Sequence, residues 1–245
     1  MLGRWSSFRC LSYERSGDGL DLLMEKRASL ICPLCQSIEL SPISMIKESS
    51  PYFLCRQCDL RFLDSKFRLD PEEEKARYLQ HNNDVSDVRY QEFLKPLFNL
   101  VLPHLGKKAQ GLDYGAGTGP ALAKMFESQG FPMALYDPFF WMDESVLRRS
   151  YDFIVCSEVA EHFYNPSIEF ERIKSLLIPG GVLGLMTSLY ISEIDFQTWY
   201  YRKDPTHVVF YSEKTLGWIA EKFKLQLVSV QSDRLILFKS EDLSD

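Results

Sequence analysis

The fold is decided by the stretch LDYGAGTG at residues 112–119, where three alternating glycines follow a short apolar strand and precede a helical pattern. Glycine permits the positive φ of a tight strand-to-helix turn, and its missing Cβ lets a ligand approach the main chain closely. The stretch lacks the third glycine of G-x-G-x-x-G, which seats the helix beneath a pyrophosphate in dinucleotide-binding folds. This departure favours S-adenosylmethionine (SAM) over a dinucleotide as the ligand of the loop.

An acidic residue, Asp137, ends a second predicted strand about twenty residues after the glycine loop. A carboxylate can accept hydrogen bonds from both hydroxyls of a ribose, as the acidic residue of dinucleotide-binding folds does. The alternative is a simple turn aspartate before Pro138, but the neighbouring glycine loop favours the ribose. Asp113, which closes the first strand, could anchor the loop or accept from the ammonium group of the methionine moiety. The aromatic residues at 139–141 could flank an adenine ring.

Strands and helices alternate after residue 108. We predict strands at 109–114, 133–136, 152–156 and 182–187, helices at 120–129 and 166–177, and last strands at about 225–230 and 234–239. Apolar strands separated by amphipathic helices build a parallel sheet covered on both faces, with ligands beyond the carboxyl ends of the strands. The three residues between the last two strands suit a hairpin at the sheet edge. The fold class is therefore α/β.

The composition is that of a globular protein. The 245 residues are 45% hydrophobic and 25% charged, which suits one medium domain with a small appendage. Because no apolar run approaches roughly eighteen residues and no signal peptide opens the sequence, we expect a soluble, cytoplasmic protein without a membrane partner. The net charge of −6 gives no general attraction to nucleic acid, so nucleic acid is possible as a partner but not favoured. The oligomeric state is left open.

The combination of motifs resembles the class I SAM-dependent methyltransferases over roughly residues 88–240. The stretches that carry the resemblance are LDYGAGTG, ALYDP at 134–138, YDFIVCSEVAEHF at 151–163, LLIPGGVLGLMT at 176–187 and DPTHV at 204–208. It implies a Rossmann-like, seven-stranded, mostly parallel sheet with a reversed final strand, although no third strand is evident between Asp137 and Tyr151. It also implies that SAM lies over the glycine loop and that residues 156–158 border the substrate. The predicted cofactor-binding residues are Asp113, Gly115, Ala116, Gly117, Gly119, Asp137, Pro138, Phe139, Ser157 and Glu158.

Four of the six cysteines form two Cys-x-x-Cys knuckles, Cys32/Cys35 and Cys55/Cys58, separated by 19 residues. Two such knuckles in a reducing compartment indicate a tetrahedral S₄ zinc site, a zinc ribbon. Four protein ligands leave no open position on the metal, so we expect its role to be structural. Residues 28–70 carry five basic and five acidic side chains, which makes the ribbon a poor electrostatic clamp for RNA.

The chain is accordingly divided into four parts. We predict a disordered or over-extended N-terminus at 1–27, with Met24 as an alternative start, then a zinc ribbon at 28–69, a helical linker or cap at 70–106 and the methyltransferase domain at 107–240. The linker begins with Asp70 as an N-cap before a helix that reaches residue 80 or 81. A second helix spans about 88–105, where Pro96 and Pro103 kink or divide it.

Methyl transfer from a sulfonium needs alignment, and it needs a base only when the acceptor carries a proton. His162 follows the fourth strand where the substrate should arrive, and His207 in DPTHV and His81 are the other candidates. A structural hydrogen-bonding role is the alternative for each. We interpret His104 as a surface residue and Cys156 as a core residue.

The predicted function is transfer of a methyl group from SAM to oxygen, nitrogen or carbon of a small molecule. Two alternatives stay open. One is an RNA base methyltransferase guided by the ribbon, and the other is a non-catalytic protein that binds SAM or interacts through its zinc module.

Overall fold

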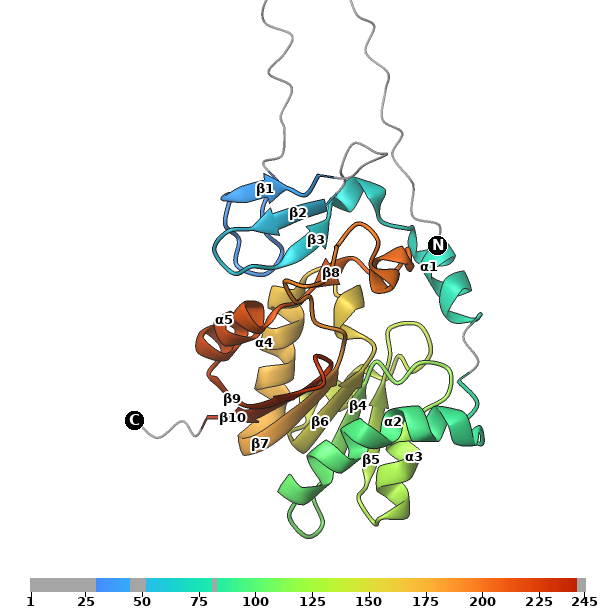
Figure 1. The fold of residues 1–245 in the computed structure, drawn as a ribbon. Coiled ribbons are helices and arrows are strands. Elements are labelled where there is room, and N and C mark those ends of the chain that lie inside the picture. Colours follow the sequence, from blue (N-terminus) through green and yellow to red (C-terminus); the bar gives the residue numbers. More distant parts are fainter. Residues whose placement is uncertain (1–29, 45–51, 81–82, 242–245) are drawn as a thin grey trace, which may run out of the picture. The chain divides into compact units, whose positions relative to one another are not determined.

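A computed structural model describes residues 30–44, 52–80 and 83–241, and its ribbon is shown in Figure 1. The expectations for residues 1–27 and for His81 lie outside these residues. The helices are α1 (Pro71–Tyr78), α2 (Val88–Val101), α3 (Ala121–Ser128), α4 (Pro166–Leu176) and α5 (Glu213–Phe223). Single 3₁₀ turns are η1 (Ser65–Phe67), η2 (Leu102–His104), η3 (Glu144–Arg148), η4 (Ala160–His162) and η5 (Tyr200–Lys203).

The larger sheet has the strand order β5-β4-β6-β7-β10-β9 among the described residues. Its strands are β4 (Gly111–Tyr114), β5 (Met133–Tyr136), β6 (Tyr151–Ser157), β7 (Leu177–Met186), β9 (Leu225–Gln231) and β10 (Leu235–Ser240). The first four in this order are parallel, and β10 is antiparallel to both β7 and β9. The reversed final strand and the edge hairpin are therefore confirmed, as is a Rossmann-like mixed sheet.

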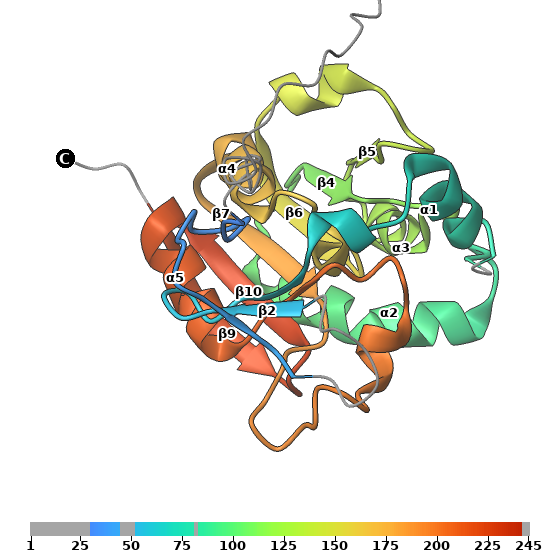
Figure 2. The same ribbon diagram turned by 90° about the horizontal axis from the view of Figure 1, so that it is seen from above.

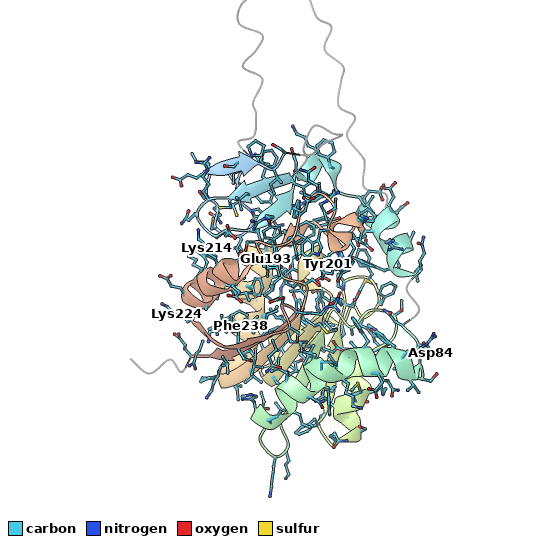
Figure 3. All side chains as sticks on the ribbon, in the orientation of Figure 1. Asp84, Glu193, Tyr201, Lys214, Lys224 and Phe238 are labelled. Carbon is cyan, nitrogen blue, oxygen red and sulfur yellow. The ribbon has the colours of Figure 1, made fainter. Side chains whose placement is uncertain are left out.

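Helices cover both faces of this sheet. Figures 1 and 2 show α2 and α3 on one face and α4 and α5 on the other. The apolar stripe of α2 explains its place, because Leu94, Leu97 and Val101 are buried in a core cluster with Phe126 of α3 and Phe153 of β6. Figure 3 shows how side chains fill the space between the layers, with the fully buried Phe238 inside the sheet region and Lys224 at the periphery. No helix of the described residues is long and apolar enough to cross a membrane.

The prediction of seven strands is wrong by one strand for the described chain. The segment between Asp137 and β6 forms an isolated bridge from Asp137 to Trp141 and then the 3₁₀ turn η3. This segment is too short for both a strand and the crossover of about a dozen residues that parallel pairing needs. Val146 is the only buried residue of η3, so the turn also lacks the apolar run of an internal strand.

Two boundary predictions also need correction. Pro96 lies inside a continuous α2, so it does not divide the helix, whereas Pro103 lies in the 3₁₀ turn that follows. The helix at 166–177 ends at Leu176 and β7 begins at the next residue, well before the predicted start at 182.

A smaller sheet has the order β1-β2-β3-β8. Its strands are β1 (Leu40–Pro42), β2 (Tyr52–Cys55), β3 (Arg61–Leu63) and β8 (Val209–Phe210). The first three belong to the cysteine-containing segment, but β8 comes from the C-terminal half and pairs antiparallel with β3. The segment predicted at 28–69 thus shares a sheet with a strand far along the chain.

Candidate active site

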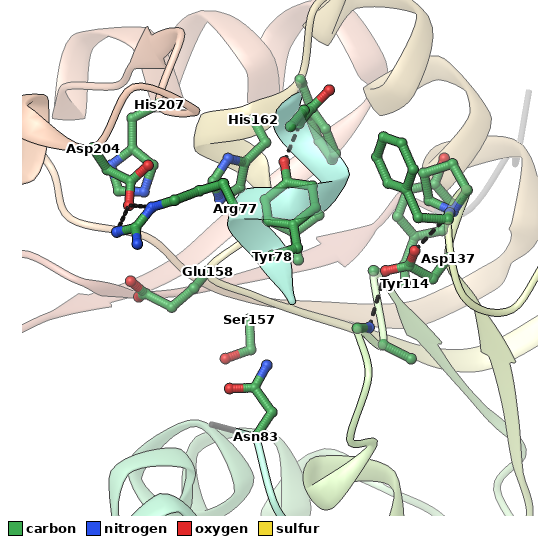
Figure 4. Close-up of a pocket in the computed structure, with 18 of the residues that line it drawn as sticks. Arg77, Tyr78, Asn83, Tyr114, Asp137, Ser157, Glu158, His162, Asp204 and His207 are labelled. Carbon is green, nitrogen blue, oxygen red and sulfur yellow. Dashed lines mark hydrogen bonds and ion pairs between the residues drawn. The ribbon is translucent and has the colours of Figure 1, made fainter. Parts of the chain in front are cut away.

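A cavity of about 850 Å³ lies beyond the carboxyl ends of β4, β5 and β6. The predicted site residues that line it are Gly115, Ala116, Gly117, Asp137, Pro138, Phe139, Ser157, Glu158, His162 and His207. Figure 4 shows Asp137 at one end of the cavity and His207 with Asp204 at the other. Asp113 and Gly119 are not among the lining residues. The sheet therefore brings most of the sequence-predicted site into one cavity.

The glycine loop after β4 needs its glycines for different reasons. Gly115 has φ +88°, and a Cβ there would lie 2.5 Å from both Cγ atoms of Val159. Gly117 has φ +59° and faces the cavity. A Cβ on Gly119 would lie 1.6 Å from the backbone oxygen of Asn83, so this glycine allows a close chain crossing and does not line the cavity.

Asp137 holds the glycine loop in place. Its carboxylate accepts from the backbone N–H groups of Gly117 at 2.9 Å, Phe139 at 2.8 Å and Phe140 at 3.1 Å. The indole N–H of Trp141 donates to the carbonyl of Gly117 at 2.8 Å. Sequence reasoning missed this loop-holding role, and it placed Trp141 beside an adenine ring. The carboxylate still lines the cavity, and each of its oxygens has two lone pairs, so acceptor capacity remains there.

Asp113 lies beneath the loop and is 4% exposed. Burial raises the pKa of its carboxyl to about 7, and a hydrogen bond from the backbone of Ala123 opposes this effect only in part. This position fits the loop-anchoring alternative better than direct contact with a ligand.

Glu158 follows β6 and points into the cavity from a strained backbone. Its φ is +53°, in the left-handed region that non-glycine residues rarely adopt, and such strain clusters at functional sites. Arg234 lies 3.4 Å from the carboxylate. Burial, aided by the charge of Glu161, raises the pKa of Glu158 to about 8, while Arg234 opposes the shift.

His162 and His207 lie side by side, with ring centroids 4.8 Å apart. The Nδ1 atom of His162 is 2.9 Å from the carbonyl of Thr206, and that of His207 is 2.6 Å from the carbonyl of Tyr201. A carbonyl only accepts, so each Nδ1 carries the proton and each Nε2 of the neutral ring presents a lone pair. Burial lowers the pKa of His162, which favours its neutral form.

Glu161 is a residue beside the histidine pair that sequence reasoning did not assign to the site. It is fully buried, and its Oε1 lies 4.0 Å from Nε2 of His162 and 3.9 Å from Nε2 of His207. The hydroxyl of Thr187 donates to its Oε2 at 2.9 Å, and that of Tyr201 donates to its Oε1 at 2.5 Å. The available signal was a second acid within the apolar stretch SEVAEHF.

Helix α1 forms another wall of the cavity. Asp70 caps the helix and forms a capping box with Glu73, as expected for this start. Arg77 pairs with Asp204 at 2.7 Å, and the ring of Tyr78 packs edge-on to His162 with centroids 5.2 Å apart. Sequence reasoning treated this helix as a linker and did not assign its side chains to the site.

The four cysteines of the two knuckles also come together. Sγ of Cys32 lies 3.5 Å from Sγ of Cys58, Sγ of Cys35 lies 3.3 Å from Sγ of Cys55, and all four sulfur atoms are within 4.8 Å of one another. Tetrahedral Zn–S bonds of about 2.3 Å place the sulfur atoms roughly 3.8 Å apart, which is within a few tenths of an ångström of these two separations. Elsewhere, Cys156 is fully buried and His104 is exposed, as expected.

Comparison with known proteins gives a consistent result. A family model described as a methyltransferase domain matches residues 86–230. The structure of Burkholderia thailandensis 1,6-didemethyltoxoflavin-N1-methyltransferase, with its substrate and S-adenosylhomocysteine (SAH), aligns with a TM-score of 0.53 at 15% identity over 82% of this chain and 100% of that chain. Human N-acetylserotonin methyltransferase with SAM aligns at 0.49 and 16% identity over 70% and 57%. No curated protein sequence matches.

Proposed function

Because the chain belongs to the methyltransferase-domain family and is a SAM-dependent methyltransferase, we propose that it methylates a small molecule in the cavity between the glycine loop and the histidine pair. The observation that supports this proposal is one cavity that both the glycine loop and the histidine pair line. Its volume of about 850 Å³ is within the range of small-molecule sites. The toxoflavin methyltransferase, whose fold is similar, acts on a small molecule.

The end of the cavity at the glycine loop fits SAM. We assign the backbone of Gly115 and Gly117 to the close approach of the cofactor and the remaining lone pair on Oδ2 of Asp137 to a ribose hydroxyl. Phe139 lines the same end and offers a ring face for an adenine. Bound SAM supplies an electrophilic methyl group on a sulfonium sulfur, so the chain has to align the acceptor and remove any proton that the acceptor carries.

The opposite end supplies groups for the proton. The Nε2 lone pairs of His162 and His207 make both residues candidates for the general base, because their Nδ1 protons are tied to backbone carbonyls. Glu158 is a further acceptor, since its carboxylate lines the cavity beside Arg234. An acceptor whose oxygen or nitrogen carries a proton would use such a base. We do not assign the acceptor atom.

We further propose that the cysteine cluster binds one structural zinc ion. The support is its geometry, with four thiols converging within 4.8 Å and no fifth Cys, His, Asp or Glu ligand atom grouped with them in the described chain. The partition into a ribbon at 28–69, a cap at 70–106 and a catalytic domain at 107–240 is retained as a proposal, although β8 belongs to the ribbon's sheet.

Transfer of a tritiated methyl group tests the proposed function. The purified protein and labelled SAM are incubated with metabolite, RNA and protein fractions of cells that lack the gene. We expect label in the metabolite fraction. Label in RNA would instead support the ribbon-guided alternative, and absence of transfer with intact SAH binding would support a non-catalytic protein.

A further inference from the structure

Glu161 is a fully buried carboxylate beside the cavity, and in the described chain it forms no ion pair with lysine or arginine. Glu158 has Arg234 at 3.4 Å, and Asp204 has Arg77 at 2.7 Å. Glu161 is 0% exposed, and the basic side chains nearest its carboxylate within the described residues are the imidazoles of His162 and His207. A buried carboxylate without a cationic partner is unfavourable, so this side chain is suited to binding a cation.

The two imidazoles offer lone pairs to such a cation. Their Nδ1 protons are used by the carbonyls of Thr206 and Tyr201, which directs both unprotonated Nε2 atoms toward Oε1 of Glu161. Three ligand atoms therefore converge within 4.8 Å of one another. Glu161 and His162 supply two of them from the η4 turn, and His207 supplies the third from the DPTHV segment. Histidines that bind metals have the same arrangement, with the second ring nitrogen donating to a carbonyl or carboxylate.

We propose that Glu161, His162 and His207 bind one divalent transition-metal cation, for which Mn²⁺ serves as the probe. Two imidazoles and one carboxylate on one side of the ion form a ligand set that leaves further coordination positions free. Metal–ligand bonds of about 2.1 Å place adjacent donor atoms roughly 3.0–3.5 Å apart. The observed separations of 3.9 and 4.0 Å thus need a contraction of about half an ångström to one ångström.

The surroundings are built to hold the ligands. Both oxygens of Glu161 accept hydrogen bonds, one from Thr187 and one from Tyr201, which fixes the carboxylate plane. These contacts correspond to the outer hydrogen bonds that orient ligands at metal sites. Neither of these two hydrogen bonds involves a residue of the glycine loop.

The position of the cluster indicates what the cation would bind. His162 and His207 line the cavity, while Glu161 lies behind them, so the free coordination positions face the acceptor space. This step rests on the proposed function. It assigns the acceptor to molecules with a hydroxyl or carbonyl oxygen that can bind the cation beside the glycine loop. Nε2 atoms that bind the cation cannot accept a proton. Removal of a proton from the acceptor is then assigned to Glu158.

Manganese binding to the full chain with its cysteine cluster saturated with zinc tests the site. Zinc is limited to one equivalent per chain, because the thiolate cluster takes that zinc, whereas excess zinc would compete with Mn²⁺ for the imidazole and carboxylate ligands. Titration with Mn²⁺ followed by electron paramagnetic resonance should show one bound ion per chain. Glu161→Gln keeps the side-chain shape but loses the charge, and we expect it to weaken Mn²⁺ binding at least 10-fold, as should His162→Ala.

His104→Ala, which removes an exposed histidine outside the cavity, is the matched control and should bind Mn²⁺ like the wild type. SAH affinity is measured for every variant to show that the fold and cofactor site are intact. Absence of Mn²⁺ binding by the wild type, or equal binding by Glu161→Gln and wild type, would overturn the metal site. The proposed methyl transfer to a small molecule is tested independently, because the tritium experiment does not measure Mn²⁺ binding.

Discussion

At Asp137 one carboxylate oxygen accepts from the N–H of Gly117 in the glycine loop, and the other accepts from two N–H groups of the chain that follows β5. Its sequence position alone suggested contact with a ribose, yet the same carboxylate also fixes Gly117. Three backbone N–H groups that donate to one carboxylate fix its position and orientation. Asp137 therefore orders the loop before any ligand arrives.

Replacing Asp137 with alanine should weaken SAH binding by about 1.5–3 kcal/mol, roughly 10- to 150-fold, because hydrogen bonds to a charged group are lost. Isothermal titration calorimetry measures the change. Asp143→Ala is the matched control, since that exposed aspartate caps η3 and does not line the cavity. Equal affinity of Asp137→Ala and wild type would exclude Asp137 from the cofactor site.

Asp113 should make the stability of the protein depend on pH. Burial raises its pKa from 3.8 to about 7 in the folded state, so the folded protein binds more protons than the unfolded chain between these values. The contribution of Asp113 to stability is thus fully present at low pH and is lost as the pH rises through about 7.

Urea unfolding of wild type and Asp113→Asn at pH 5 and pH 8 tests this effect. Asparagine stays neutral, so the free energy of unfolding of the wild type relative to the variant should fall by about 2–3 kcal/mol between the two pH values. Asp233→Asn, at an exposed turn, serves as the control. A wild-type-to-Asp113→Asn difference that is the same at both pH values would show that the buried carboxyl does not carry this proton.

At the scale of elements, the pairing of β3 with β8 links the cysteine cluster to the site. Arg61 pairs with Phe210 and Phe62 with Val209, and the backbone N–H of Leu63 donates to the carbonyl of Val208 at 2.8 Å. His207 directly precedes this segment. The strand that the ribbon holds therefore leads straight into the histidine pair, at the end of the cavity away from the glycine loop.

Replacing Cys55 and Cys58 by serine should release about one zinc ion per chain and unfold the ribbon, because a structural zinc site contributes its binding energy to folding. SAH affinity should stay unchanged, since the catalytic domain has a core of its own, which α2, α3, β6, β7 and β10 build outside the ribbon. Turnover should fall, because the support of His207 through β3 and β8 is lost. Metal analysis, calorimetry and methyl transfer measure the three effects.

Cys156→Ala is the control for this variant, since Cys156 is buried in β6 outside the cluster and its loss should leave zinc in place. If removal of zinc abolished SAH binding itself, the ribbon would be part of the cofactor site, and the proposed separation of the ribbon from the catalytic domain would be wrong.

For the molecule as a whole, the sequence predicts best what local patterns encode. The glycine loop, Asp137 after β5 and the edge hairpin follow from turn chemistry and strand periodicity, and the structure has each of them. The seventh strand was predicted from the family resemblance and not from a local pattern. The larger sheet of the described residues lacks it, because the segment before β6 is too short for a strand and a crossover.

Features made by distant segments could not be predicted from local pattern. Glu161 looked like one more charge near His162 until Thr187, Tyr201 and His207 were brought around it by β7 and by the segment before β8. The side chains of α1 enter the site for the same reason, since only the folded chain shows Arg77 against Asp204. Sequence periodicity carries no information about such contacts between separate elements.

The most direct test of the central claim is the transfer of tritiated methyl from SAM to metabolites by wild type, His207→Ala and His104→Ala. We expect wild type and His104→Ala to label a small-molecule fraction equally. His207→Ala should lose at least about 100-fold in rate, because His207 serves the acceptor end of the cavity either as a base or as a ligand of the proposed cation, while its SAH affinity is retained. Labelling of RNA instead of metabolites, or full activity of His207→Ala, would contradict a small-molecule site built between the glycine loop and the histidine pair.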